Sequence, residues 1–342
     1  MHQCSGTPAH PLLSLLTIPP VPCGIPQSEI HNLYATHFNN IANVLLVNTY
    51  LYLPNDEVYS IVEVEFYLRD TASNHADPYT HGDVHQLTCG EWYFHRVGKN
   101  GYRGGTRKGV DLTFGSIKRN IYGGILIRSI KNERSGDVIE GPSLVVDQIL
   151  KACGVNTNGG IRKLVETIWS FKKGALKDME NSNNMVYLEL KSSINNTITA
   201  DKVGILPATK KRKLGESGSE RQQNISDGKN PAEQYLSVYN SPRVGLTLTD
   251  KQEIAYLFKP YRYFTQPFLL KKGRGQLIAG LMATVRDCQE IAKIAGLAVS
   301  TVSSYYSDYA AGKESCNIAE FVGQRLNTVM FVRMAGAVDS MK

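Results

Sequence analysis

The sequence IVEVEFYLRD, residues 61–70, alternates apolar with polar side chains and is rich in β-branched and aromatic residues. This pattern predicts a β-strand, in which side chains two positions apart share one face. Glu63, Glu65 and Tyr67 are therefore expected on one face. The opposite face is expected to carry Val62, Val64, Phe66 and Leu68. A carboxylate beside an aromatic ring suits a site that stacks a flat ligand and activates water, although the same pattern fits the solvated face of an edge strand.

Histidines crowd the segment after this strand, because four of the eight in the chain lie between positions 75 and 95. Four side chains there are possible zinc ligands: His75, His81, His85 and Cys89. Their spacing matches no closed zinc-site signature, and histidines in a polar loop also pack or face water. A metal-dependent hydrolase that uses the cluster from His75 to Cys89 therefore stays open as an alternative.

Composition narrows the class of protein. No window approaches the roughly 18 to 20 apolar residues of a membrane span, so no membrane partner is expected. The six cysteines are scattered without a CxxC pair, which indicates free thiols in a reducing intracellular compartment. The net charge of +7 is uneven, with nine Lys and Arg against one acid in residues 96–131 and five against none in residues 259–274. Such segments fit a phosphate-facing surface or an ordinary solvated face.

The chain begins with a proline-broken segment, residues 1–27, which is expected to be a flexible tail rather than a signal peptide. Helical spacing after a Ser28 cap predicts a first helix with an apolar face of Ile30, Leu33, Tyr34, Phe38 and Ile41. The run ANVLLVNTYLYL, residues 42–53, predicts a buried strand in a hairpin with the Glu65 strand. Further strands are expected at GEWYFHR, GGILIRSI and MVYLEL, and further helices from Pro142 and over residues 161–168.

Residues 192–234 are rich in Ser, Asn, Gly, Lys and Glu, which predicts a low-complexity insertion. Within it, the run from Lys210 to Lys213, KKRK, resembles a nuclear-import signal and predicts a nuclear protein. An ordinary charged loop is the alternative.

Residues 276–342 are expected to form a helical C-terminal extension. Its sequence CQEIAKIAGLAVSTVSSYY resembles a helix-turn-helix, with the characteristic positions at Ala292, Gly296, Val302 and Tyr305. The second helix, residues 299–311, carries no Lys or Arg. Packing onto the main domain is therefore favoured over the reading of DNA.

Several short motifs follow one another in an order known from an enzyme family. They are IVEVEFY, a downstream His, GxxY, a strand ending in ILIR, EGPS before a helix, SPRVGL at 241–246 and KPYRYF at 259–264. Together they resemble the alkyladenine (3-methyladenine) DNA glycosylase family over residues 28–275. The resemblance implies an α+β fold with a mixed, mainly antiparallel sheet and flanking helices. No cofactor is expected. The chain is expected to be a monomer, and its expected partner is double-stranded DNA with a damaged base.

The resemblance also implies roles for single residues. Glu65 would activate the attacking water, and Arg128 would help hold the water and the carboxylate. The base pocket would contain Tyr67, His75, His95 and Asp111. DNA contacts are expected from the glycine-rich hairpin and from the last two motifs, at Tyr102, Arg103, Arg107, Lys108, Arg243, Lys259 and Arg262. Tyr102 is the candidate for the side chain that plugs the emptied base stack.

The chain departs from the family at three of these places. His95 stands where the family has a second stacking tyrosine, and Asp111 where it has an asparagine that screens out guanine. The hairpin before Asp111 is also several residues longer. The resemblance implies no lysine nucleophile. It therefore implies a monofunctional N-glycosylase that hydrolyses the bond to a flipped-out, modified base without strand cleavage. A non-catalytic DNA-binding protein on the same scaffold is the other alternative.

Overall fold

The computed structural model describes residues 10–98, 100–177, 179, 181–191, 236–249 and 253–341. The strands are β1 (Thr49–Leu53), β2 (Glu57–Asp70), β3 (His75–Ala76), β4 (Cys89–Phe94), β5 (Arg96–Val97), β6 (Gly101–Tyr102), β7 (Val110–Phe114), β8 (Tyr122–Asn132), β9 (Val138–Glu140), β10 (Tyr187–Leu190), β11 (Tyr239–Ser241) and β12 (Arg262–Phe264). The helices are α1 (Pro11–Leu16), α2 (Gln27–Val47), α3 (Pro142–Ala152), α4 (Gly160–Arg162), α5 (Ile254–Leu257), α6 (Arg274–Thr284), α7 (Cys288–Ala295), α8 (Val299–Ser315) and α9 (Thr328–Asp339).

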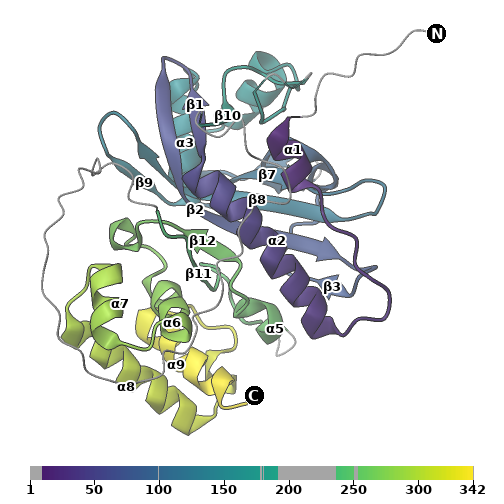
Figure 1. The fold of residues 1–342 in the computed structure, drawn as a ribbon. Coiled ribbons are helices and arrows are strands. Elements are labelled where there is room, and N and C mark those ends of the chain that lie inside the picture. Colours follow the sequence, from purple (N-terminus) through teal and green to yellow (C-terminus); the bar gives the residue numbers. More distant parts are fainter. Residues whose placement is uncertain are drawn as a thin grey trace, which may run out of the picture.

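The long strand β2 is the axis of the main sheet. Its neighbours give the order β10-β1-β2-β8-β7-β4, and every pair along this path is antiparallel. The middle of β2, residues 63–65, also pairs with β12, which in turn pairs with β11. Helix α2 runs across the sheet, and the C-terminal helices gather below β11 and β12 (Figure 1). The predicted α+β class, with a mainly antiparallel sheet and flanking helices, is confirmed.

A β-bulge at Val62 changes which residues of β2 share a face. Ile61 pairs with Ile130 and Glu63 pairs with Ser129, so Val62 has no partner in the ladder. The side chain of Val62 packs in the cluster formed with the C-terminal helices, whereas Val64 lies in the main core. The prediction that Val62 shares a face with Val64 is therefore wrong, because an extra residue in one strand reverses the alternation locally.

Helix α2 extends further than the sequence pattern predicted. It begins after Pro26 without a side-chain cap, so the Ser28 cap is wrong, and it continues to Val47. The first part of ANVLLVNTYLYL is thus helical, and only Thr49–Leu53 forms the strand β1 that pairs with β2. A short, fully buried apolar run has no periodicity that separates helix from strand.

The N-terminal segment is part of the core over residues 11–18. Leu12 and Leu16 of α1 are each 1% exposed, and Ile18 is buried beside them. A flexible tail is therefore the wrong description of this part, because its apolar side chains cover the sheet. Residues 1–9 lie outside the described residues.

The C-terminal helices pack onto the sheet through one apolar cluster. Val62 and Phe264 of the sheet lie in it together with residues of α6 to α9, including Leu277 and Val302. Gly296, at φ +64°, joins α7 to α8. This angle favours glycine and allows the tight turn predicted there.

Among the described residues, no helix combines the length and the apolar character that a membrane crossing requires.

Candidate active site

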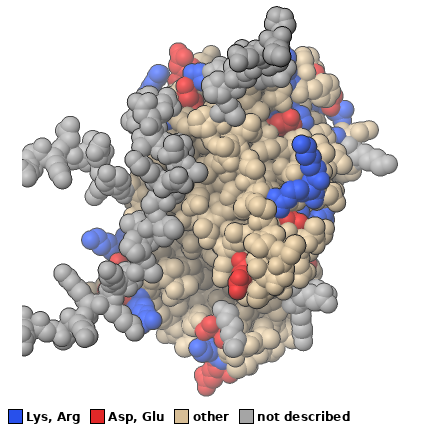
Figure 2. Space-filling view, turned by 45° about the vertical axis from the view of Figure 1, so that its right-hand side comes forward, with Lys and Arg blue, Asp and Glu red and all other residues tan. Residues whose placement is uncertain are grey.

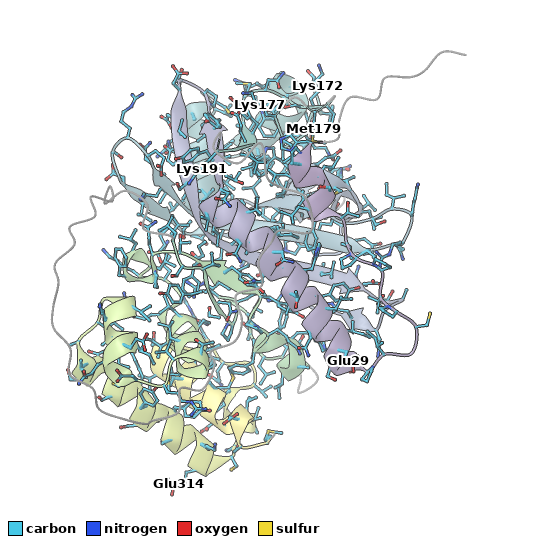
Figure 3. The ribbon with its side chains drawn as sticks, in the orientation of Figure 1. Glu29, Lys172, Lys177, Met179, Lys191 and Glu314 are labelled. Atoms are coloured by element: carbon cyan, nitrogen blue, oxygen red, sulfur yellow. The ribbon has the colours of Figure 1, made fainter. Side chains whose placement is uncertain are left out.

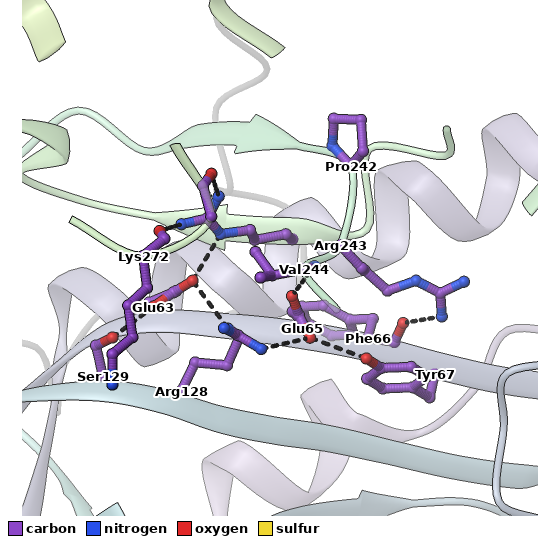
Figure 4. A network of polar contacts seen from close by, with 12 residues as sticks. Glu63, Glu65, Phe66, Tyr67, Arg128, Ser129, Pro242, Arg243, Val244 and Lys272 are labelled. Carbon is purple, nitrogen blue, oxygen red and sulfur yellow. Dashed lines mark hydrogen bonds and ion pairs between the residues drawn. The ribbon is translucent and has the colours of Figure 1, made fainter. Parts of the chain in front are cut away.

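Glu65 lies at the centre of a polar network on β2 and is fully buried (Figure 4). The backbone N–H of Val244 donates to its Oε1 at 2.6 Å, and the Tyr67 hydroxyl donates to its Oε2 at 2.9 Å. Arg128 on β8 donates to the same Oε2 at 3.3 Å. The structure therefore brings together Glu65, Arg128 and Tyr67, the three residues that the sequence put at the centre of the chemistry.

Glu63 forms the second half of this network and was not predicted to act in the site. Its Oε1 accepts from Arg128 Nε at 3.0 Å and from Arg262 Nε at 2.6 Å. The Ser129 hydroxyl donates to its other oxygen. The sequence held one signal for this role of Glu63. Strand alternation puts Glu63 on the same face as Glu65, where Arg128 reaches both carboxylates.

The network shifts the pKa values of Glu63 and Arg128. Burial raises the pKa of Glu63, but the charges of Arg262 and Arg128 outweigh burial, so the net shift is downward. Burial lowers the pKa of Arg128, but Glu65 and Glu63 outweigh it, so that pKa is raised. Arg128 is therefore a lasting positive charge next to Glu65.

Tyr67 is held from both sides. Burial and the adjacent Glu65 raise its pKa well above the ordinary value, so the phenol stays a neutral donor. The Arg243 guanidinium lies 4.5 Å from the ring centroid, and Arg243 is itself fixed by Asp77 through bonds of 2.6 and 3.1 Å. The ring therefore has a fixed orientation for stacking.

A pocket of about 270 Å³ opens beside Tyr67. Its walls combine flat rings with a few polar groups, which suits a planar heterocycle. The lining residues are Tyr67, Tyr79, His81, Gln86, His95, Arg103, Asp111, Gly245 and Leu246.

Asp111 is engaged by two residues of this pocket. His95 Nε2 lies 2.7 Å from its Oδ1, and Gln86 Nε2 donates to its Oδ2 at 3.3 Å. Three of the four predicted pocket residues thus line one cavity: Tyr67, His95 and Asp111.

His75 is the exception and lies in the core. Its Nδ1 bonds to the Leu68 carbonyl at 3.1 Å, its Nε2 bonds to the Tyr261 hydroxyl at 3.0 Å, and the side chain is 0% exposed. The prediction of a pocket role for His75 is therefore corrected, because short strand β3 turns the ring inward. The histidine that lines the pocket in addition to His95 is His81, which no motif singled out for it.

Three of the predicted phosphate contacts are buried ion pairs. Lys108 pairs with Asp147, Arg243 with Asp77 and Arg262 with Glu63, and none of the three is more than 6% exposed. Their side chains are therefore not available to a DNA backbone, which corrects the prediction. The partners lie 39, 166 and 199 residues away in the chain, so no local pattern revealed them.

The other predicted DNA contacts are more accessible. Arg107 is exposed, Lys259 is partly exposed, and Arg103 is partly exposed and lines the pocket. On the face drawn in Figure 2, the described Lys and Arg side chains are scattered rather than gathered in one patch.

Tyr102 lines a second, larger cavity of about 480 Å³, together with Trp92, Tyr93 and Arg162. Glu65 and Arg128 line neither cavity, but Tyr67, which bonds to Glu65, lines the smaller one and not this one. Volume alone would favour the larger cavity as the site, but the link through Tyr67 to Glu65 and the stacking rings favour the smaller pocket.

The described residues contain no group of three or more His, Cys, Asp or Glu able to hold a metal ion. The predicted zinc ligands are therefore dispersed: His75 lies in the core, His81 lines the pocket and His85 pairs with Asp83. The basic run from Lys210 to Lys213 and the insertion around it lie outside the described residues.

Comparisons with known proteins match a part of the chain. No protein-family model matches the chain. Uncharacterized protein L759 of Acanthamoeba polyphaga mimivirus is 37% identical over 136 residues, which are 36% of this chain and 62% of that protein. The chain thus spans less than two thirds of the length of this viral relative.

Proposed function

We propose that this protein is a monofunctional DNA N-glycosylase, which hydrolyses the bond between deoxyribose and a modified base rotated out of the duplex. The supporting observation is the link between Glu65 and the pocket. Tyr67 lines the cavity with its ring and bonds Glu65 with its hydroxyl, so a stacked base would sit next to the carboxylate. The motif order that resembles the alkyladenine DNA glycosylase family supports the same reaction.

The pocket fits a single base better than a larger ligand. Its volume of about 270 Å³ lies just below the usual range for small-molecule sites, about 300–1,000 Å³. Aromatic walls from Tyr67, Tyr79 and His95 would stack the base from its faces, and Gln86 and Asp111 present polar atoms to its edge. Rotation of the base out of the helix would bring its sugar carbon toward Glu65 and Arg128.

A non-catalytic DNA-binding protein is the second candidate, and one observation favours it. Both oxygens of Glu65 already accept hydrogen bonds from protein donors, and the side chain is 0% exposed. For catalysis, DNA binding would have to open this network so that the attacking water could reach Glu65.

A panel of duplexes, each with a single modified base, distinguishes the two candidates. The duplexes are incubated with the full chain and then scored for abasic sites by alkaline cleavage. Release of any base, with uncut strands before the alkali step, supports a monofunctional glycosylase. Tight duplex binding without release from any member of the panel supports the second candidate.

A further inference from the structure

The larger cavity, of about 480 Å³, has an apolar floor. Its size falls within the usual range for small-molecule sites, about 300–1,000 Å³. Trp92, Phe94 and Val165 line it and form this floor, since each is at most 2% exposed. Trp92 Nε1 donates to the Val186 carbonyl at 2.9 Å, which holds the indole in one orientation. A flat ring that entered the cavity would therefore meet fixed aromatic and aliphatic surfaces.

Three cations line the same cavity, and each forms an ion pair at 3.4 to 3.9 Å. The pairs are Arg96–Asp83, Arg162–Glu166 and Lys173–Glu91. They are looser than the buried pair of Arg243 with Asp77, whose atoms are 2.6 Å apart. Among the described residues that line the cavity, Glu166 is the one carboxylate. A phosphate, which carries more charge than a carboxylate, can therefore compete for these cations.

The backbone beside the cavity has two rare features. Residues Lys163–Ile168 form a π-helix, and Val165 and Glu166 within it line the cavity. Ser170 and Phe171 follow with φ angles of +48° and +62°, in the left-handed region that residues with a side chain seldom adopt. Such features are concentrated at functional sites, where the surrounding structure holds the strain.

The strained turn presents an aromatic ring at the cavity. Phe171 lines the cavity and yet is 64% exposed. Neither the strain nor the exposure of this ring stabilises the fold, so a role in binding accounts for them better than packing does. A flat ligand stacked on Phe171 would cover the exposed face of the ring.

We propose that the larger cavity binds a nucleotide, with its base against Phe171 and the apolar floor and its phosphate on Arg162 and Lys173. A free nucleotide and a nucleotide within a single strand share this chemistry. The inference goes beyond the proposed glycosylase function and does not depend on it, because no described residue lines both this cavity and the pocket beside Tyr67.

Intrinsic fluorescence gives a direct readout, because both tryptophans of the chain lie at or beside this cavity. Trp92 lines it, and the ring of Trp169 lies 5.7 Å from that of Phe94, measured between centroids. The full chain is titrated with deoxyadenosine monophosphate, which represents any nucleotide because stacking tolerates every base. Saturable quenching is expected. Deoxyadenosine and inorganic phosphate should each bind at least about tenfold more weakly, because each lacks half of the ligand.

Phe171→Gly separates binding from stability. It removes the ring and relieves the strain, since glycine adopts a positive φ freely. Nucleotide binding should weaken by about 5- to 100-fold, the contribution of one stacked base, while the melting temperature should not fall. Phe268→Gly is the control, because Phe268 is also exposed but does not line the cavity. Its nucleotide affinity should equal that of the wild type.

Arg162→Gln tests the phosphate contact independently. It should weaken nucleotide binding by about tenfold and leave the binding of deoxyadenosine unchanged. Arg134→Gln, at an exposed position between β8 and β9, should change neither affinity.

A short single-stranded oligodeoxyadenylate distinguishes the two sources of the nucleotide. If it displaces the mononucleotide and binds more tightly, the site takes a nucleotide of a strand; otherwise the site takes the free nucleotide. Absence of saturable nucleotide binding in calorimetry up to about 1 mM would overturn the proposal. Nucleotide binding that both Phe171→Gly and Arg162→Gln leave unchanged would overturn it as well. Base release that depends on Glu65 is measured separately and is unaffected by either result.

Discussion

The Tyr67 hydroxyl donates a hydrogen bond of 2.9 Å to Oε2 of Glu65, and the ring of the same tyrosine lines the pocket. The wall that would stack a base and the carboxylate that would activate water are therefore joined directly. Arg128 reaches the same oxygen from the neighbouring strand. Stacking and water activation are expected to depend on each other for this reason.

Tyr67→Phe tests this link, because it keeps the ring and removes the hydroxyl. A hydrogen bond to a charged group contributes about 1.5–3 kcal/mol, so base release should fall by roughly ten- to a hundredfold. Duplex affinity should not change. Tyr187→Phe is a suitable control, since Tyr187 stacks on Tyr52 at the far edge of the sheet. Unchanged release in Tyr67→Phe would show that the hydroxyl does not help to position Glu65.

Adjacent basic residues should differ in their effect on DNA affinity. Arg107 is exposed, whereas Lys108 is 6% exposed and paired with Asp147. Arg107→Gln should flatten the slope of log affinity against log salt by about one unit, and Lys108→Gln should leave the slope unchanged. Binding titrations at several salt concentrations measure both. An equal change in slope for the two variants would show that Lys108 reaches DNA after all.

Arg243→Gln is expected to lower the free energy of unfolding. Removal of one partner of a buried ion pair costs about 3–5 kcal/mol, because Asp77 would be left charged and unpaired. Urea unfolding should show this loss. Arg333→Gln should change stability little, because the Arg333 side chain beside Asp308 is 52% exposed. If Arg243→Gln were as stable as the wild type but bound DNA less tightly, Arg243 would be a phosphate contact after all.

Stability should fall as pH falls from about 6.5 to about 4. Burial lowers the pKa of His75 and of His37 from 6.5 to about 4, so the unfolded state takes up their protons first. The two buried histidines therefore contribute fully to stability above pH 6.5, their ordinary pKa. This contribution is lost as the pH falls toward about 4, their pKa in the folded state. The urea midpoint should be lower at about pH 5 than at about pH 7.5, and His75→Gln should reduce that difference. Equal urea midpoints of the wild type at the two pH values would contradict this role of the buried histidines.

The sequence predicted those parts of the site that share one local pattern. Alternation in residues 61–70 placed Glu65 and Tyr67 on one face, as the structure has them. The bulge at Val62 was not predictable, because it depends on the register against β8. Burial of Arg243 and Arg262 depends on distant partners, and so a basic stretch of sequence did not reveal ion pairs that lie under the surface.

Replacement of Glu65 tests the central claim most directly. Glu65→Gln is compared with Glu29→Gln, an exposed position near the start of α2 (Figure 3), on the duplex from which the wild type releases a base fastest. Thermal melts first establish that both variants are folded. We expect Glu65→Gln to abolish base release while its duplex affinity stays within a few fold of the wild type, because phosphate contacts dominate binding. Base release by Glu65→Gln at the rate of Glu29→Gln would contradict the assignment of this carboxylate as the general base.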